Sequence, residues 1–299
     1  MEIIAKPKLD LVFKKIFTDT ENTYLLVDFI SSVKGISKED MLNIIIVDNE
    51  IIPDAVNKKF SRLDLLLQTP NEQINIEIQV NNYGNFKERA LYYWSKIFTM
   101  KLNKNDDYSK LQKTISINII DFNLFENDKP HSSFMVMEKE RHEILSDKFR
   151  IDFLELKKAN KSENKNLKEW LDFLSVTTEE GLDMIEKTTT NPDIICKAVA
   201  VVRKMSADEQ FLFTVQKREE TMLNEKWAIN DAKNEGRAEG LKEGEKKGKI
   251  EGRIEGKIEG KIEGKIESVN NLLKNNFSLS DALKFIGIDE ETYRKYSLS

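Results

Sequence analysis

Apolar and polar residues recur along the chain in two periods, one helical and one typical of strands. The segments "LDLVFKKIF" and "ENTYLLVDFISSV" repeat apolar residues at helical spacing and predict two short amphipathic helices near the start of the chain. The β-branched run "MLNIIIVDNEII" predicts a strand that ends near Pro53. The stretch "RLDLLLQTPNEQINIEIQV", residues 62–80, predicts a hairpin of two strands joined by the turn residues of "TPNE".

The helical period returns between residues 83 and 104. The apolar stripe expected on that helix consists of Ala90, Leu91, Trp94, Ile97 and Phe98. Three later segments, "TISINIIDFNLF", "SFMVMEKE" and "DFLELKK", predict further strands, and after about residue 160 the pattern is helical throughout. This order predicts an α/β (α+β) domain with a mixed central sheet, followed by a helical region. A capping box formed by Ser206 and Glu209 is expected to begin the longest helix of that region.

Between residues 236 and 264 a glycine occupies every fourth position, so eight of the chain's twelve glycines lie in one repetitive segment. As a helix, this segment would align isoleucines, glutamates and lysines in slowly twisting stripes, with like charges four residues apart. Each glycine in a helix interior costs about 1 kcal/mol relative to alanine, so this helix should not be stable alone. Two interpretations stay open for residues 236–267: a helix that pairs with a partner helix in a homo-oligomer, or a flexible charged spacer.

Composition narrows the chemistry that the chain can perform. The net charge is −5, so contact with nucleic acid would depend on a local basic surface rather than on the overall charge. The single cysteine, Cys196, excludes a disulfide framework and a multi-cysteine zinc site. The two histidines, His131 and His142, have no other plausible ligand nearby in the sequence, which argues against histidine-based hydrolase or metal chemistry. No segment reaches the ~18 uninterrupted apolar residues of a membrane span, so a cytoplasmic protein without membrane contact is expected.

Two carboxylates and an amide interrupt the apolar hairpin. Glu77 and Gln79 point to the same face of one strand, and the partner strand brings Asp64 alongside. A buried carboxylate without a partner is costly, so such a group pairs, changes its pKa or binds a metal. Oxygen donors of this kind suit Mg²⁺ or Mn²⁺, which would polarise a phosphate and activate a water molecule. In the alternative, structural interpretation, Asp64 pairs with Arg62 or Lys59, and the other two residues lie on a solvated sheet face.

These motifs together resemble a known family of enzymes. An acid on one strand and E-x-Q on the next, followed by a helix, resemble the PD-(D/E)XK nuclease superfamily. Within it, "LDLVFKKIF", "FSRLD" and "INIEIQV" in that order resemble the Rpn family of recombination-promoting nucleases and transposase-like proteins, over roughly residues 6–125, and the repetitive tail is also similar to tails in that family. The resemblance implies a restriction-endonuclease-like core, Mg²⁺ or Mn²⁺ as cofactor, and DNA as substrate.

The resemblance also assigns roles to individual residues. It implies that Asp64 and Glu77 bind the metal and that Gln79 completes the catalytic set. Gln79 stands where many relatives have lysine, and glutamine can orient a water molecule but cannot take or give a proton. Asp10 and Lys14 match the first-helix motif and are accessory candidates, although an acid at that position is also a good helix cap.

The helix expected between residues 83 and 104 is a candidate DNA-binding surface. Its five basic residues, against the single acid Glu88, give a local net charge of +4. Lys87, Arg89 and Lys96 are the residues expected to contact DNA phosphates, since such contacts need positive charge but read no bases. Ordinary solvated lysines beside a core helix would produce the same pattern.

The sequence therefore predicts four segments and one of two functions. The segments are a PD-(D/E)XK nuclease-like domain at 1–160, a helical region at 161–235, the tetrapeptide repeat at 236–267 and a small helical C-terminal unit at 268–299. The first function is a metal-dependent DNA endonuclease linked to recombination or mobile elements. The second is a non-catalytic DNA-binding or self-assembling scaffold that keeps the nuclease fold. The complete D…E-x-Q set favours the endonuclease.

Overall fold

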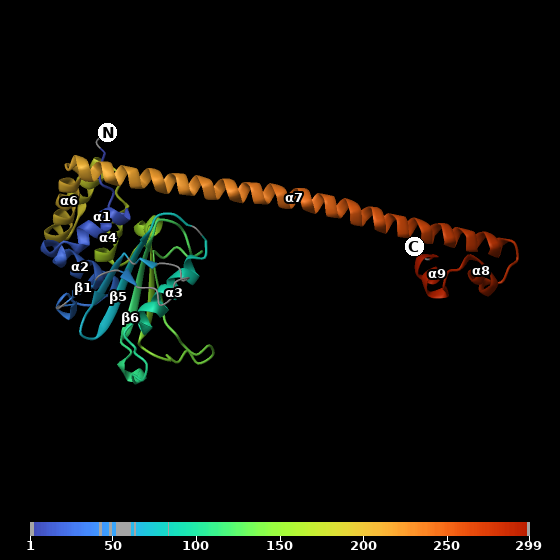
Figure 1. Cartoon of the computed structure of the whole chain (residues 1–299), viewed down its shortest axis with the longest axis horizontal. Helices are drawn as coiled ribbons and strands as arrows, with labels where there is room; N and C mark the ends of the chain where they lie inside the picture. The colour runs from blue at the N-terminus through green and yellow to red at the C-terminus, as the bar shows by residue number, and fades with distance from the viewer. Residues whose placement is uncertain are drawn as a thin grey trace. The chain divides into compact units, whose positions relative to one another are not determined.

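A six-stranded mixed sheet forms the centre of the first part of the chain, residues 1–226, in the computed structural model, which describes residues 3–41, 44–47, 50–51, 61–62, 64–82 and 84–297 (Figure 1). The strand order is β1-β4-β5-β6-β8-β7; β5, β6 and β8 run parallel, and the other pairs are antiparallel. The strands are β1 Ile45–Val47, β4 Leu65–Gln68, β5 Glu72–Gln79, β6 Lys113–Ile120, β7 His131–Phe134 and β8 Phe149–Glu155. A separate two-stranded sheet pairs β2, Glu50–Ile51, with β3, Ser61–Arg62.

Helices cover both faces of the six-stranded sheet (Figure 1). The isoleucines of β5 and β6 pack in one hydrophobic core whose helical residues come mainly from α1 Asp10–Thr18, α2 Thr23–Lys34, α4 Lys165–Ser175 and α6 Pro192–Ser206. The helix α5, Glu179–Thr188, packs beside α4 and α6. On the other face, α3, Phe86–Thr99, contacts Ile120 and Phe153 through Phe86 and Ala90. This arrangement confirms the restriction-endonuclease-like α/β core with a mixed central sheet.

Most of the expected elements are present, with shifted ends. The hairpin within residues 62–80 is confirmed as β4 and β5, and the first two helices are confirmed as α1 and α2. The helix expected over residues 83–104 is shorter, and Leu91, placed in its inward stripe, is exposed. The last two strands begin earlier than expected, and residues 156–161 form a 3₁₀ helix rather than the end of a strand. Pro53 lies outside the described residues.

The capping box expected at Ser206 and Glu209 is wrong. Ser206 is the last residue of α6; its hydroxyl donates to Val202 O and accepts from Ala5 N. Asp208 takes the capping position, because its carboxylate accepts a 3.0 Å hydrogen bond from the backbone N–H three residues ahead. The Ser206 hydroxyl therefore links the N-terminal segment to α6 through Ala5 N and does not cap the following helix.

The chain divides into two compact units, Met1–Lys226 and Trp227–Ser299, and the helix α7, Glu209–Lys274, runs from the first into the second. The glycine repeat is helical throughout. Within the second unit, α8, Leu279–Ile286, and α9, Glu290–Ser297, form a small apolar cluster with the end of α7 around Val269 and Leu283. Ser278 caps α8, because its hydroxyl accepts a hydrogen bond from Asp281 N. Across the described part of the chain, no helix combines the length and apolar character needed to cross a bilayer.

Candidate active site

Asp64 and Glu77 lie beside each other at the open end of the β4–β5 hairpin. The register pairs Leu65 with Ile76, so Asp64, which directly precedes β4, is opposite Glu77. The Asp64 N–H donates a 3.3 Å hydrogen bond to Glu77 Oε1, and Asp64 Oδ2 accepts a 2.9 Å hydrogen bond from Ile78 N. The two residues are only 9% and 7% exposed. The hairpin therefore brings the two predicted metal-binding acids together in a largely buried position.

The pKa of Glu77 reports the electrostatics of this pair. Burial raises the pKa of Glu77 most, the charge of Asp64 raises it further, and hydrogen bonds from Asp64 and Asn75 with the charge of Arg89 lower it, giving a value of about 8. A carboxyl with this pKa is mostly protonated at neutral pH. Burial and the charge of Asp64 thus outweigh the hydrogen bonds and the charge of Arg89, and an added cation would stabilise the ionised pair.

Lys14 supplies part of that positive charge from α1. Its Nζ lies 2.9 Å from Asp64 Oδ1, and both side chains keep some contact with solvent. Asp10, one helical turn earlier, is tied to α7 instead: Arg218 Nη2 lies 3.1 Å from Asp10 Oδ2. The structure thus brings Lys14 to the carboxylate pair, whereas it holds Asp10 in a different ion pair.

Gln79 lies on the same face of β5 as Glu77 and is held by α3. Its amide oxygen accepts a hydrogen bond from Arg89 Nη2. The Arg89 guanidinium also lies over the Phe86 ring, with Cζ 4.7 Å from the ring centroid, and its charge lowers the pKa of Glu77. Arg89, expected from the sequence to contact DNA, is therefore a neighbour of the site itself. Lys14 and Arg89 reach the site from helices on opposite faces of the sheet.

The other two residues expected to contact DNA lie on α3. Lys87 is exposed, and its Nζ is 5.0 Å from the centroid of the Phe125 ring. Lys96 is half-buried, with Nζ 5.7 Å from the centroid of the Tyr92 ring. The apolar side of α3 packs on the same sheet face that carries Glu77, so these two basic residues and the carboxylate pair belong to one side of the domain.

Asn75 is a site residue that the sequence analysis missed. It is fully buried on β5, two residues before Glu77, and its Nδ2 donates a 3.4 Å hydrogen bond to Glu77 Oε1. Its Oδ1 is buried and has no hydrogen-bond partner among the described residues. Buried polar atoms nearly always have a partner, and an amide oxygen is a ligand that hard cations accept. The sequence pattern that could have identified Asn75 is the alternation of polar and apolar residues in "QINIEIQ", which places residues 73, 75, 77 and 79 on one face of the strand.

The donor atoms fit a hydrated divalent cation better than a fully protein-bound one. Within the described residues, no group of three or more His, Cys, Asp or Glu side chains is arranged to hold a metal ion. Two carboxylates and an unpartnered amide oxygen instead resemble the partial ligand set of Mg²⁺, which usually keeps several waters. Of the alternative partners for Asp64, Lys59 lies outside the described residues, as does the side chain of Arg62.

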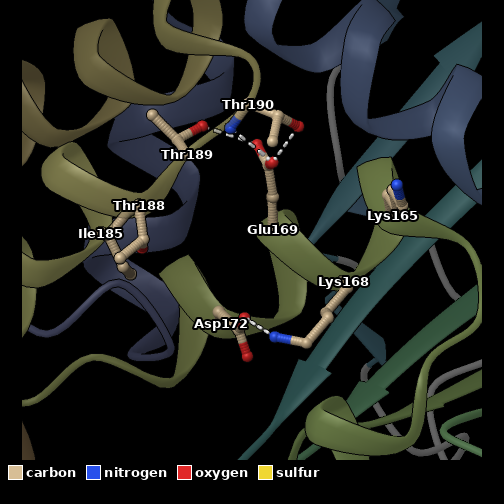
Figure 2. A pocket seen from close by; sticks show the side chains of 8 residues that line it. All are labelled: Lys165, Lys168, Glu169, Asp172, Ile185, Thr188, Thr189 and Thr190. Carbon is tan, nitrogen blue, oxygen red and sulfur yellow. Dashed lines mark hydrogen bonds and ion pairs between the residues drawn. The ribbon is translucent and has the colours of Figure 1, made fainter.

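A cavity of about 220 Å³ between α4 and the end of α5 is a second polar region (Figure 2). Glu169 accepts hydrogen bonds from both hydroxyls of Thr189 and Thr190 and from Thr190 N. Lys168 Nζ pairs with Asp172 Oδ2 across one turn of α4. Although burial raises the pKa of Glu169, hydrogen bonds from Thr189 and Thr190 outweigh this effect and lower that pKa, whereas burial and the charge of Asp64 raise the pKa of Glu77. The hairpin is therefore the stronger candidate for chemistry.

Comparison with protein-family models gives a match over most of the chain. A family model described as PD-(D/E)XK nuclease family transposase matches residues 7–232. No curated protein and no solved structure was found to match the chain. The matched region covers most of the chain and contains the first helix, the hairpin with Asp64 and Glu77, and α3. The chain therefore belongs to the family of PD-(D/E)XK nuclease transposases.

Proposed function

We propose that this protein is a metal-dependent DNA endonuclease that hydrolyses phosphodiester bonds in recombination or in the movement of mobile elements. Its membership of a nuclease family supports a nuclease or transposase role, and nucleases of this superfamily generally use divalent metal ions. The observation that carries the proposal is the buried Asp64–Glu77 pair, in which burial and mutual repulsion raise the pKa of Glu77 to about 8. Such a pair has the chemistry of an Mg²⁺ or Mn²⁺ site.

Asp64 and Glu77 would hold the ion, with the amide oxygen of Asn75 as a further donor. Glu77 Oε2 accepts no hydrogen bond from the described residues, so this oxygen is available to a cation. The bound ion would polarise a phosphodiester and promote ionisation of the attacking water. The hydrogen bond from Ile78 N and the ion pair with Lys14 keep the Asp64 carboxylate in place for this role.

Lys14 would provide the positive charge that Gln79 lacks. Gln79 cannot transfer a proton, and its amide oxygen is occupied by Arg89, so its NH₂ group is the part that can orient a water or a phosphate oxygen. The Lys14 ammonium, 2.9 Å from Asp64, can donate hydrogen bonds to phosphate oxygens and stabilise charge that develops on them. Lys87 and Lys96 on α3 would bind neighbouring phosphates.

Replacing Lys14 by methionine is expected to reduce DNA cleavage by about 10- to 100-fold, because residues that support metal ligands contribute on this scale. Lys15→Met is the matched control, since Lys15 is exposed and its Nζ lies 4.0 Å from the centroid of the Phe211 ring, away from Asp64. Initial cleavage rates of the two variants on one plasmid substrate provide the measurement. Equal rates for Lys14→Met and Lys15→Met would exclude a role for Lys14.

Cleavage is expected to require a divalent metal. The full-length protein with Mg²⁺ or Mn²⁺ should convert supercoiled plasmid DNA to nicked or linear forms, and excess chelator should stop the reaction completely. Activity should return when Mg²⁺ exceeds the chelator, because the protein carboxylates remain in place without the ion. Cleavage that continues at full rate in chelator would contradict the proposed site, and DNA binding without any cleavage would favour the scaffold function.

A further inference from the structure

The isoleucines that recur every fourth residue of α7 are buried at the end of the repeat and exposed in its middle. Ile266 is buried in the second unit and Ile262 is half-buried, but Ile250, Ile254 and Ile258 are 52–54% exposed. These residues are four apart and share one side of the helix. Exposed isoleucines are common singly, but a regular row of them along one helix is a surface for a partner.

Two stripes of opposite charge flank these isoleucines. Successive residues of an α-helix are about 100° apart, so the residue before each isoleucine and the residue after it lie on opposite flanks. One flank carries Lys249, Arg253 and Lys257, and the other carries Glu251, Glu255 and Glu259. Along each flank the neighbours at i+4 have the same charge and repel. Within residues 248–267, all of them described, no ion pair is formed; the nearest, Lys247 with Glu243, precedes them.

The glycines of the repeat have no structural use within a single chain. Apart from the adjoining backbone of the helix itself, a Cβ added at any of the eight would meet no atom within 4 Å. The glycines nevertheless destabilise the helix by about 1 kcal/mol each relative to alanine, and repulsion along the two flanks adds to this. The glycines lie on the side of the helix opposite the isoleucines, so they take no part in a contact through the isoleucine face, and that contact has to offset their cost.

We propose that the α7 helices of two copies of this chain pair in parallel through their isoleucine faces. In a parallel pair the two-fold axis runs along the helices, so the basic flank of each copy faces the acidic flank of the other on both sides. In an antiparallel pair the two-fold axis is perpendicular to the helices and sets glutamates against glutamates and lysines against lysines. Charge complementarity therefore indicates that the partner of the isoleucine face is a second copy of this chain, and it favours the parallel orientation.

The spacing of the repeat also sets the handedness of the pair. Four residues correspond to a rotation of about 400° around the helix axis. Each four-residue repeat therefore displaces the next isoleucine by roughly 40° around the helix in the right-handed sense. A hydrophobic period longer than 3.6 residues produces a right-handed supercoil. This pairing does not depend on the proposed nuclease activity, because it involves residues outside the catalytic hairpin.

Cysteine cross-linking of the full-length protein tests the orientation. In a Cys196→Ser background, Ile250→Cys and Ile258→Cys are each expected to form a disulfide-linked dimer when oxidised alone, since equal positions meet in a parallel pair. Gly256→Cys, on the opposite side of the helix, is the control and should cross-link at least tenfold less. Cross-linking at only one isoleucine position, or at neither, would overturn the parallel pairing. Cross-linking that occurs only when the two variants are mixed would also overturn it, because it would indicate an antiparallel pair.

Charge reversal tests the recognition itself by sedimentation of the full-length protein. One variant combines Glu251→Lys, Glu255→Lys and Glu259→Lys; the other combines Lys249→Glu, Arg253→Glu and Lys257→Glu. Each variant alone is expected to self-associate at least tenfold more weakly than the unmodified protein, and an equimolar mixture should recover the dimer. A monomeric unmodified protein at every concentration, a larger oligomer, or variants that each dimerise normally would refute the proposal.

Discussion

Replacing Glu77 by glutamine is expected to reduce DNA cleavage by on the order of 10³-fold, since it removes one of the two proposed metal ligands. The amide has nearly the shape of the carboxyl, and Glu77 is predominantly protonated near neutral pH in the metal-free protein, so the fold should be retained. The isosteric Asp64→Asn change should have an effect of the same order, because the two carboxylates act together. Cleavage rates at saturating Mg²⁺ provide the measurement.

The control for both variants is Asp172→Asn. This change also converts a carboxylate to an amide, but Asp172 lies on α4 and pairs with Lys168. It should leave cleavage within about twofold of the unmodified protein. If Glu77→Gln and Asp64→Asn cleaved DNA as fast as this control, the hairpin would not be the catalytic site.

The metal-free protein is expected to become less stable as the pH rises from about 4.5 to 8. The pKa of Glu77 increases from 4.5 in the unfolded chain to about 8 in the folded one, so the folded state binds more protons across this interval. The stabilisation from this group is complete below pH 4.5 and is lost as the pH passes through 8. A difference of this size corresponds to at most about 5 kcal/mol in the free energy of unfolding.

Urea unfolding in chelator at several pH values tests this expectation. The Glu77→Gln variant should lose most of the decrease in the free energy of unfolding with rising pH. Above pH 8 it should be more stable than the unmodified protein. Asp172→Asn should keep the decline, because the carboxyl at 77 is unchanged in it. Added Mg²⁺ should stabilise the unmodified protein at pH 8 but not Glu77→Gln. Identical pH profiles for Glu77→Gln and the unmodified protein would show that Glu77 titrates normally.

Local patterns were enough to predict the hairpin and the adjacency of its two acids. The two-residue period of β5 predicts which side chains share a face, and the turn after β4 fixes which residues are opposite. These short-range rules placed Asp64 beside Glu77 without any knowledge of the rest of the sheet. The family resemblance suggested a metal-binding role for the pair, and the family match shows that the chain belongs to a nuclease family.

Contacts between distant segments were not predictable in the same way. Lys14 and Arg89 reach the hairpin from two different helices, and their partners depend on how the layers pack rather than on sequence spacing. Asp10 shows the limit most clearly, because its partner Arg218 lies more than two hundred positions away. Asn75 was missed because a buried amide on a strand has no signature apart from alternation. The parallel order of β5, β6 and β8 likewise requires crossover connections that periodicity does not specify.

The four-residue period of α7 has a consequence for how the gene can change. One unit corresponds to four codons, so duplication or deletion of a unit preserves the reading frame and reproduces the same side-chain stripes. Each such event lengthens or shortens the helix by about 6 Å. The length of α7 can therefore change in steps of four residues, with no alteration of the hairpin that carries Asp64 and Glu77.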